Sequence, residues 1–137
     1  MLNVVIVGYD KALSSAMTGV ADLFGLAGVT WNRIQGQEPQ RLFNVRIASP
    51  DGEPVKCING IQLLAHMSYD QVEDVDAIVI PTIGGPVEDV VGNTPELMAL
   101  LQRADQAGWT IAGNCTGNFL LAEAGILDGK TATTHWG

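Results

Sequence analysis

The chain has 137 residues, the length of one domain, and its 47% hydrophobic content is sufficient for one core. It carries 7 Lys and Arg against 15 Asp and Glu, so the formal net charge of −8 disfavours contact with nucleic-acid phosphates. Two cysteines are too few for a disulfide scaffold, and no apolar run approaches the roughly 20 residues of a membrane span. We therefore expect one cytoplasmic domain over residues 1–137, with no membrane contact, metal or cofactor.

The N-terminal part predicts a buried strand followed by a helix. The short apolar run Leu2–Val7 stops at a glycine, which is typical of a central strand in a parallel sheet. Residues 12–26 repeat apolar side chains at helical spacing, and we expect Asp10 to cap that helix. The polar stretch 30–40 predicts a loop, with room for a short strand.

The rest of the chain alternates predicted strands with helices. Residues 44–48 predict a strand, and Asn59-Gly60 predicts a hairpin between strands at 55–57 and 61–64. The remaining predicted elements are a strand at 76–80, a helix between the N-cap Thr94 and Gly108, a strand at 109–112, a helix at 118–124 and a strand at 130–134. This alternation predicts a three-layer α/β sandwich around a mainly parallel sheet.

The end of the sequence follows directly on the last predicted strand, with no closing helix. We therefore expect the chain to be truncated before the last elements of its fold. Uncovered apolar helix faces would then favour self-association.

Residues 113–117 read Gly-Asn-Cys-Thr-Gly between a strand and a helix, which is the pattern of a nucleophile elbow with Cys115 in the central place. Small neighbours are needed because the turn is tight, and the helix N-terminus favours a thiolate. A buried structural cysteine beside two turn glycines is the alternative. Ligands of such folds bind at the carboxyl ends of the strands, where Asn114 and Thr116 also fall.

Two other features could complete a site at Cys115. Gly84 and Gly85 follow a predicted strand, where backbone N–H groups could form an oxyanion hole, although ordinary turn glycines fit equally well. His135 lies 20 residues after Cys115 and is either a partner of the thiol or a structural residue. Neither His66 nor Cys57 has partners at metal-ligand spacing.

Three segments, Ile80–Gly85, the Cys115 elbow and Ala124–Trp136, resemble the ThiJ/PfpI branch of the class I glutamine amidotransferase-like superfamily. The version fused to AraC-type transcriptional regulators is the most similar. The resemblance implies a flavodoxin-like sandwich, a homodimer and a downstream helix-turn-helix domain through which alone DNA would be contacted.

Enzymes of this branch carry a carboxylate close to the cysteine sulfur, and aligning Thr18-Gly19 with their Thr-Gly puts Ala16 at that position. A methyl group transfers no proton. We therefore favour a non-catalytic, ligand-sensing and dimerising regulator domain that binds an unidentified small polar molecule between Gly84-Gly85, Cys115 and His135. The alternatives are a cysteine-dependent enzyme (isocyanide hydratase-like, glyoxalase-like or amidase) and a degenerate fold whose cysteine senses peroxide.

Overall fold

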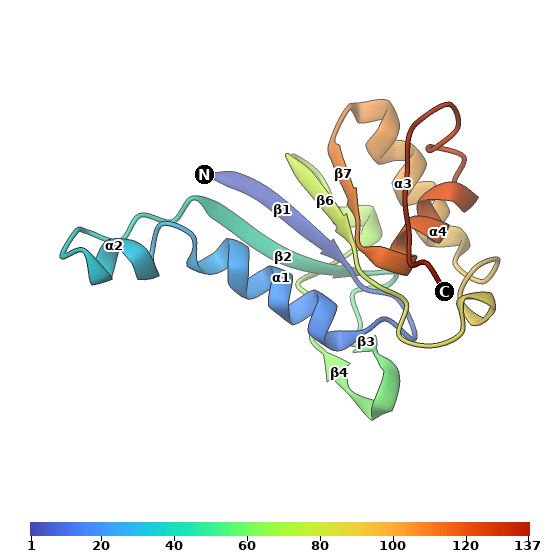
Figure 1. The fold of residues 1–137 in the computed structure, drawn as a ribbon, viewed down its shortest axis with the longest axis horizontal. Coiled ribbons are helices and arrows are strands. Elements are labelled where there is room, and N and C mark those ends of the chain that lie inside the picture. The colour runs from blue at the N-terminus through green and yellow to red at the C-terminus, as the bar shows by residue number, and fades with distance from the viewer.

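The computed structural model describes all 137 residues, which form a five-stranded parallel sheet in the order β5-β2-β1-β6-β7 (Figure 1). A separate antiparallel pair, β3-β4, projects from it. The strands are β1 (Leu2–Val7), β2 (Phe43–Ser49), β3 (Val55–Lys56), β4 (Gln62–Leu63), β5 (Met67–Ser68), β6 (Ala77–Ile80) and β7 (Thr110–Gly113).

The strand β1 is central because nothing in its second half is polar. Val4, Val5, Ile6 and Val7 are at most 1% exposed. β1 pairs along its whole length with β2 on one side, and through Val4–Ile6 with β6 on the other. A strand covered on both faces must be apolar at successive positions, which is the pattern that predicted it.

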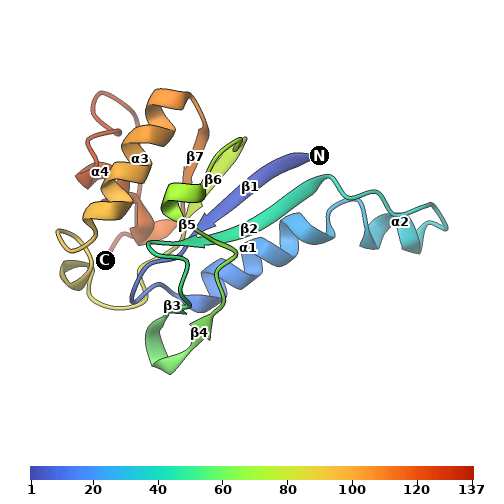
Figure 2. The same ribbon diagram turned by 180° about the vertical axis from the view of Figure 1, so that it is seen from behind.

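Helices cover both faces of the sheet. The helix α1 packs on the face formed by β1 and β2, whereas α3 and α4 cover the opposite face beside β7 (Figures 1 and 2). The α-helices are α1 (Ser14–Leu26), α2 (Thr30–Ile34), α3 (Pro95–Ala107) and α4 (Asn118–Glu123). This is the predicted three-layer, flavodoxin-like α/β sandwich. No helix is long and apolar enough to cross a bilayer.

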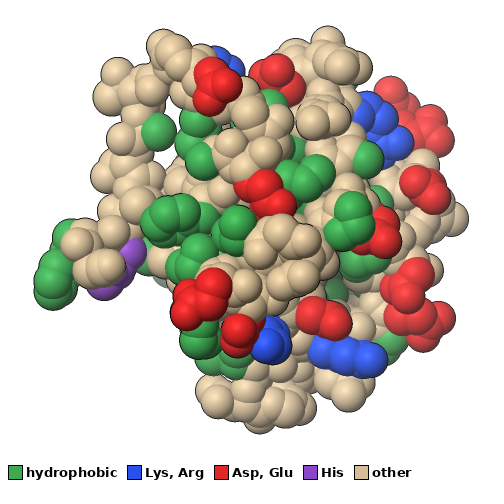
Figure 3. Space-filling view, turned by 90° about the vertical axis from the view of Figure 1, so that its right-hand side faces the viewer, with side chains coloured by type: hydrophobic (Ala, Val, Ile, Leu, Met, Phe, Trp, Pro, Cys, Tyr) green, Lys and Arg blue, Asp and Glu red, His purple; other side chains and the backbone are tan.

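The helix α3 begins and ends as the sequence predicts. Its apolar stripe is buried, Pro95 occupies the first turn, and Gly108 ends it with a left-handed φ of 75°. Thr94 is the N-cap residue, but its side chain makes no capping hydrogen bond, and its hydroxyl oxygen is buried without a partner. On this side of the molecule, acidic side chains surround hydrophobic ones (Figure 3).

The prediction that Asp10 caps the helix α1 is wrong. The helix α1 starts at Ser14, with Leu13 at its N-cap. Residues 11–13 are occupied by tertiary backbone bonds: the Leu13 N–H donates to the Thr82 carbonyl at 2.9 Å, and Ala12 forms a bridge with Ile83. The helix α1 therefore begins only after residues 11–13 have paired with the loop that follows β6.

The structure differs from the sequence prediction in three further places. The predicted loop at 30–40 contains the five-residue helix α2, and the two-residue strand β5 was not predicted. The strand predicted at 130–134 is absent: residues 131–137 are exposed and have no regular secondary structure. The hairpin around Asn59-Gly60 is confirmed, with Val55 opposite Leu63.

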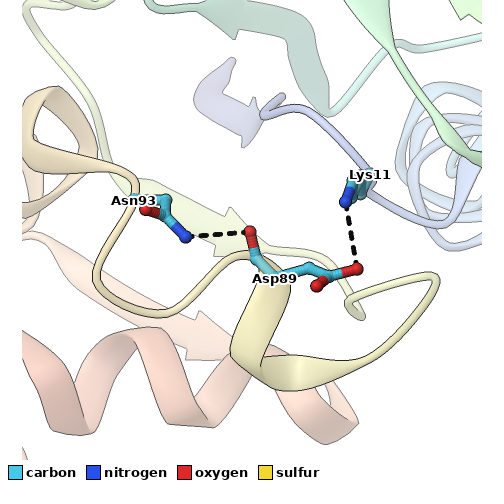
Figure 4. A network of polar contacts seen from close by, with 3 residues as sticks. All are labelled: Lys11, Asp89 and Asn93. Carbon is cyan, nitrogen blue, oxygen red and sulfur yellow. Dashed lines mark hydrogen bonds and ion pairs between the residues drawn. The ribbon is translucent and has the colours of Figure 1, made fainter.

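The loop after β1 is fixed by Lys11, which adopts a left-handed φ of 69°. Its ammonium pairs with the Asp89 carboxylate at 3.0 Å, and the Asn93 amide donates to the Asp89 carbonyl at 3.1 Å (Figure 4). The Lys11 N–H donates to the Lys56 carbonyl, and the Lys11 carbonyl accepts from the Gly84 N–H, both at 2.8 Å. Lys11 thus connects the loop after β1 to β3, to the loop after β6 and to Asp89.

Leu101→Ala tests whether α3 supports the sheet. Leu101 is completely buried, so removing its side chain should lower the free energy of unfolding by about 2–5 kcal/mol. Urea denaturation followed by circular dichroism measures this. The exposed neighbour Gln102 provides the control, since Gln102→Ala should change stability by less than about 0.5 kcal/mol. Equal effects of the two variants would contradict the packing.

Candidate functional site

Cys115 lies at the turn between β7 and α4 and opens a single 3₁₀ turn, Cys115–Gly117. Its φ is 51°, in the left-handed region, which costs a non-glycine residue about 1–2 kcal/mol. Such strain persists only where the surrounding structure imposes it. The strained strand-to-helix turn predicted for Cys115 is therefore confirmed. The thiol is free and half-buried.

Small residues around Cys115 are required by close backbone approach. A Cβ on Gly117 would lie 2.6 Å from the carbonyl oxygens of both Ile80 and Pro81, and one on Gly113 would overlap the Asn118 side chain. The contacts at Gly117 are with backbone atoms, which cannot rotate away as a side chain can. The elbow thus sits directly on the end of β6, as the spacing of the two glycines predicts.

Side-chain hydrogen bonds hold the elbow against the loop after β6. The Thr82 hydroxyl donates to Asn114 Oδ1 at 2.6 Å, and Thr116 Oγ1 accepts from the Ile83 N–H at 3.0 Å. The predicted site residues Asn114 and Thr116 therefore serve first to join two loops. A ligand that bonds to Asn114 Oδ1 would have to compete with the Thr82 hydroxyl.

Two further residues bond to the elbow backbone. Asn118 Nδ2 donates to the carbonyls of Cys115 (3.0 Å) and Gly113 (3.2 Å), and the Thr134 hydroxyl donates to the Cys115 carbonyl at 2.8 Å. No role was predicted from the sequence for Thr82, Asn118 or Thr134. The only signal available was that each is a polar residue within two positions of a proposed site residue.

The backbone donors expected at the glycine pair are partly engaged. The Gly84 N–H donates to the Lys11 carbonyl at 2.8 Å, and a Cβ at Gly84 would lie 2.7 Å from Ile58. Gly84 therefore permits close packing. The N–H of exposed Gly85 has no partner in the chain and is the one left to face a ligand.

Neither of the two positions from which a side chain could exchange a proton with Cys115, residues 16 and 135, provides a group that contacts the elbow. Ala16 lies in the first turn of α1, which is attached to the loop after β6 through Leu13, and presents only a methyl group. His135 is exposed: its ring stacks on Trp136 with centroids 5.4 Å apart, and its Nδ1 accepts from the Gly137 N–H. The neighbour Thr134, rather than His135, makes the hydrogen bond to the elbow.

A cavity of about 650 Å³ lies at the carboxyl ends of β1 and β2, beside the start of α3, and Cys115 is not part of it. Its charged lining residues are Asp10, Asp51, Glu53, Lys56 and Glu96, so four carboxylates face one ammonium. No group of three or more His, Cys, Asp or Glu side chains is arranged to hold a metal ion.

Two buried tyrosines form the floor of this cavity. The hydroxyl of Tyr9 donates to the Pro81 carbonyl, and that of Tyr69 donates to the Gly8 carbonyl. Burial raises the pKa of Tyr69 well above its usual range, with smaller effects from Tyr9, Glu96 and Asp10. Burial, and then the nearby Cys57, raise the pKa of Tyr9 likewise.

Residues 27–137 match the DJ-1/PfpI family. The chain belongs to that family. The ThiJ/PfpI resemblance drawn from the elbow and its flanking segments is therefore confirmed.

Regulators and an enzyme are both among the relatives. The chain is 35% identical over 95 residues to the HTH-type transcriptional regulator CdhR of Pseudomonas aeruginosa, which covers 69% of this chain and 27% of the regulator. It is 33% identical over 92 residues to the isonitrile hydratase of Pseudomonas putida, covering 67% of this chain and 40% of the hydratase. The chain thus spans about a quarter of the regulator and less than half of the enzyme.

The fold is also that of a solved regulator structure. An AraC family transcriptional regulator from Pseudomonas putida superimposes with a TM-score of 0.76 at 22% identity, over 99% of this chain and 68% of that chain. At that identity the likeness concerns the fold alone.

Gly117→Ala should destabilise the protein by about 1–3 kcal/mol, because its methyl group would meet two backbone carbonyls. Thermal and urea unfolding measure the change. Gly85→Ala is the matched control: nothing lies within 4 Å of its Cβ position, so it should stay within about 0.5 kcal/mol of the parent. A Gly117→Ala protein as stable as the parent would refute the close approach.

Stability should fall above about pH 10, where tyrosines of the unfolded chain lose their protons. The buried tyrosines have raised pKa values and stay protonated when folded, so their contribution is complete below pH 10 and is lost as the pH rises further. Urea unfolding at pH 8–11 should show this slope, and Tyr69→Phe should reduce it. An unchanged slope in that variant would contradict the assignment.

Proposed function

We propose that this chain is the ligand-sensing and dimerising domain of an AraC-type transcriptional regulator and that it has no catalytic turnover. DNA would be bound by a separate helix-turn-helix domain. The observation that carries the proposal is that His135 stacks on Trp136 instead of contacting the elbow, and that Ala16 stands where the resemblance places the carboxylate of related enzymes. A positioned proton-transfer group typically accelerates a reaction by about 10²–10⁴-fold.

The engaged backbone donors support the same proposal. An oxyanion hole needs donors that are free when charge develops on the substrate. The Gly84 N–H bonds to the Lys11 carbonyl and the Ile83 N–H bonds to the Thr116 hydroxyl, so two donors of the loop after β6 are engaged and the exposed Gly85 N–H is free. The similarity to HTH-type regulators is further support.

The ligand has two candidate positions at the carboxyl edge of the sheet. One is the elbow, between Gly84-Gly85, Cys115 and His135, as the sequence analysis proposes. The other is the cavity beside α3, whose four carboxylates and one ammonium would disfavour an anionic molecule. In either place, binding would act by biasing the arrangement of two subunits, and with it the spacing of their DNA-binding domains.

The alternative is a cysteine-dependent enzyme of the isocyanide hydratase, glyoxalase or amidase type. Two observations favour it: Cys115 retains the strained elbow geometry, and the chain is similar to an isonitrile hydratase. A strained cysteine without a nearby acid or base is nevertheless an incomplete catalytic site.

Steady-state turnover separates the two functions. Purified protein should hydrate isocyanides, convert methylglyoxal and hydrolyse amides no faster than its Cys115→Ser variant, since no proton-transfer group is available. Cys115-dependent turnover on the order of 1 s⁻¹ or faster would overturn the regulator proposal. Ligand screening by thermal shift on the same two proteins locates binding: equal shifts favour the cavity, and loss in Cys115→Ser favours the elbow.

A further inference from the structure

The cavity beside α3 has the size and the position of a binding site for a small molecule. Its volume of about 650 Å³ is in the usual range for such sites, and parallel sheets bind ligands at the carboxyl ends of their strands. Most of its lining comes from the loops after β1 and β2, the strand β3 and the start of α3. Cys115 contributes nothing to it, so the cavity is separate from the elbow.

The chain does not compensate the charge of this cavity. Four carboxylates against the single ammonium of Lys56 leave a formal charge of −3. Three of the carboxylates, those of Asp10, Glu53 and Glu96, accept no hydrogen bond and form no ion pair, because the two salt bridges of the chain join other residues. A cation in the cavity would therefore meet carboxylates whose oxygen atoms are free to accept hydrogen bonds.

The hydroxyl of Thr94 is a second, independent indication that the cavity takes a ligand. Thr94 lines the cavity at the start of α3, and its hydroxyl oxygen is buried without a hydrogen-bond partner. Although Thr94 is the N-cap residue, its side chain makes no hydrogen bond to the first turn of the helix. A buried hydroxyl without a partner destabilises a folded protein, and an N–H group of a ligand in the cavity would satisfy it.

The carboxylates are distributed around the cavity instead of converging on one point. They come from the loop after β1, the loop after β2 and the first turn of α3, and no three of them are arranged to hold a metal ion. This distribution suits an organic cation better than a single metal ion. It also suits two separated positive groups better than one.

The floor of the cavity is apolar. Its buried lining residues include Tyr9, Val55, Tyr69 and Leu97, which are each at most 3% exposed. Both tyrosine O–H groups already donate to backbone carbonyls. A short carbon chain that joins the positive groups of a ligand would therefore meet an apolar surface.

We propose that this cavity binds a small aliphatic amine, and that it binds two ammonium groups more tightly than one. The ammonium N–H groups donate to the free carboxylates and to Thr94 Oγ1, and the carbon chain lies on the apolar floor. This inference rests on the ligand-sensing part of the proposed function, and it assigns the ligand to the cavity rather than to the elbow.

Isothermal titration calorimetry with four-carbon compounds of different charge tests the ligand class. The diamine 1,4-diaminobutane should bind about tenfold more tightly than 1-aminobutane, whereas 1,4-butanediol and succinate should not bind, because the cavity is negatively charged. Added salt should weaken the binding of the diamine. A diol or a dicarboxylate that binds as tightly as the diamine would overturn the inference.

Thr94→Val tests the buried hydroxyl. Valine has nearly the same shape but no hydroxyl, so binding of 1,4-diaminobutane should weaken about tenfold. The stability of the free protein to urea should not fall, because the hydroxyl has no partner within the chain. Unchanged amine binding, or a clear loss of stability without ligand, would overturn the assignment of Thr94 to the ligand.

A charge-matched pair of variants tests the position of the site. Asp10→Asn and Asp128→Asn each remove one negative charge from an exposed residue, but only Asp10 lines the cavity. Asp10→Asn should weaken binding of 1,4-diaminobutane about tenfold, and Asp128→Asn should bind it like the parent protein. Equal effects of the two variants would attribute the binding to the overall charge of the chain and overturn the cavity as its site.

These outcomes are distinct from those that test the proposed function. Cys115-dependent turnover would overturn the regulator proposal without affecting amine binding in the cavity. Amine binding that is lost in Cys115→Ser but kept in Asp10→Asn would move the ligand to the elbow and overturn this inference alone. If none of the four compounds binds, the inference is overturned, while a thermal shift with another ligand would still support the ligand-sensing function.

Discussion

The close approach of the elbow to the end of β6 constrains the rest of the carboxyl edge. Because Gly117 lies against the carbonyls of Ile80 and Pro81, the chain must reverse within two residues of β7, which forces Cys115 into the left-handed region. The surrounding threonine and asparagine side chains then hold this turn by bonding to its backbone. Precise positioning of the cysteine is thus a packing consequence that does not require catalysis.

The same constraint shows that the elbow geometry does not depend on an active site. Thr116 reaches the Ile83 backbone, and Gly84 packs against Ile58 while bonding to Lys11. These contacts join β1, β6 and β7 whether or not a substrate is present. An alanine at position 16, where the resemblance places the carboxylate of related enzymes, leaves those contacts unaffected, so fold and chemistry can separate.

The elements predicted correctly from the sequence are those with a regular pattern of buried apolar residues along their whole length. The strand β1 is apolar throughout its buried part, and α3 has a clear stripe with Pro95 and Gly108 at its ends, so both were predictable. Local rules did not predict what tertiary contacts decide. Asp10 does not cap α1 because the backbone of residues 11–13 pairs with the loop after β6.

The candidate site was predictable to the same degree. The spacing of Gly113, Cys115 and Gly117 predicted the strained turn, since sterics at those positions are local. Neither the engagement of the Gly84 N–H by Lys11 nor the separation of the 650 Å³ cavity from Cys115 could be predicted, because each depends on which loops meet at the sheet edge.

The helix α1 connects the carboxyl edge of the sheet to the opposite end of the molecule. Its first turn, with Ala16, is attached to the loop after β6 through Leu13, and its last residues include the exposed Leu23 and Leu26. Thirteen residues at about 1.5 Å each make it roughly 20 Å long, and it packs against β1 and β2 along the way. Position 16 therefore lies on an element that the sheet holds in place. The side chain at this position can change the chemistry at the carboxyl edge while the packing of α1 on the sheet is kept.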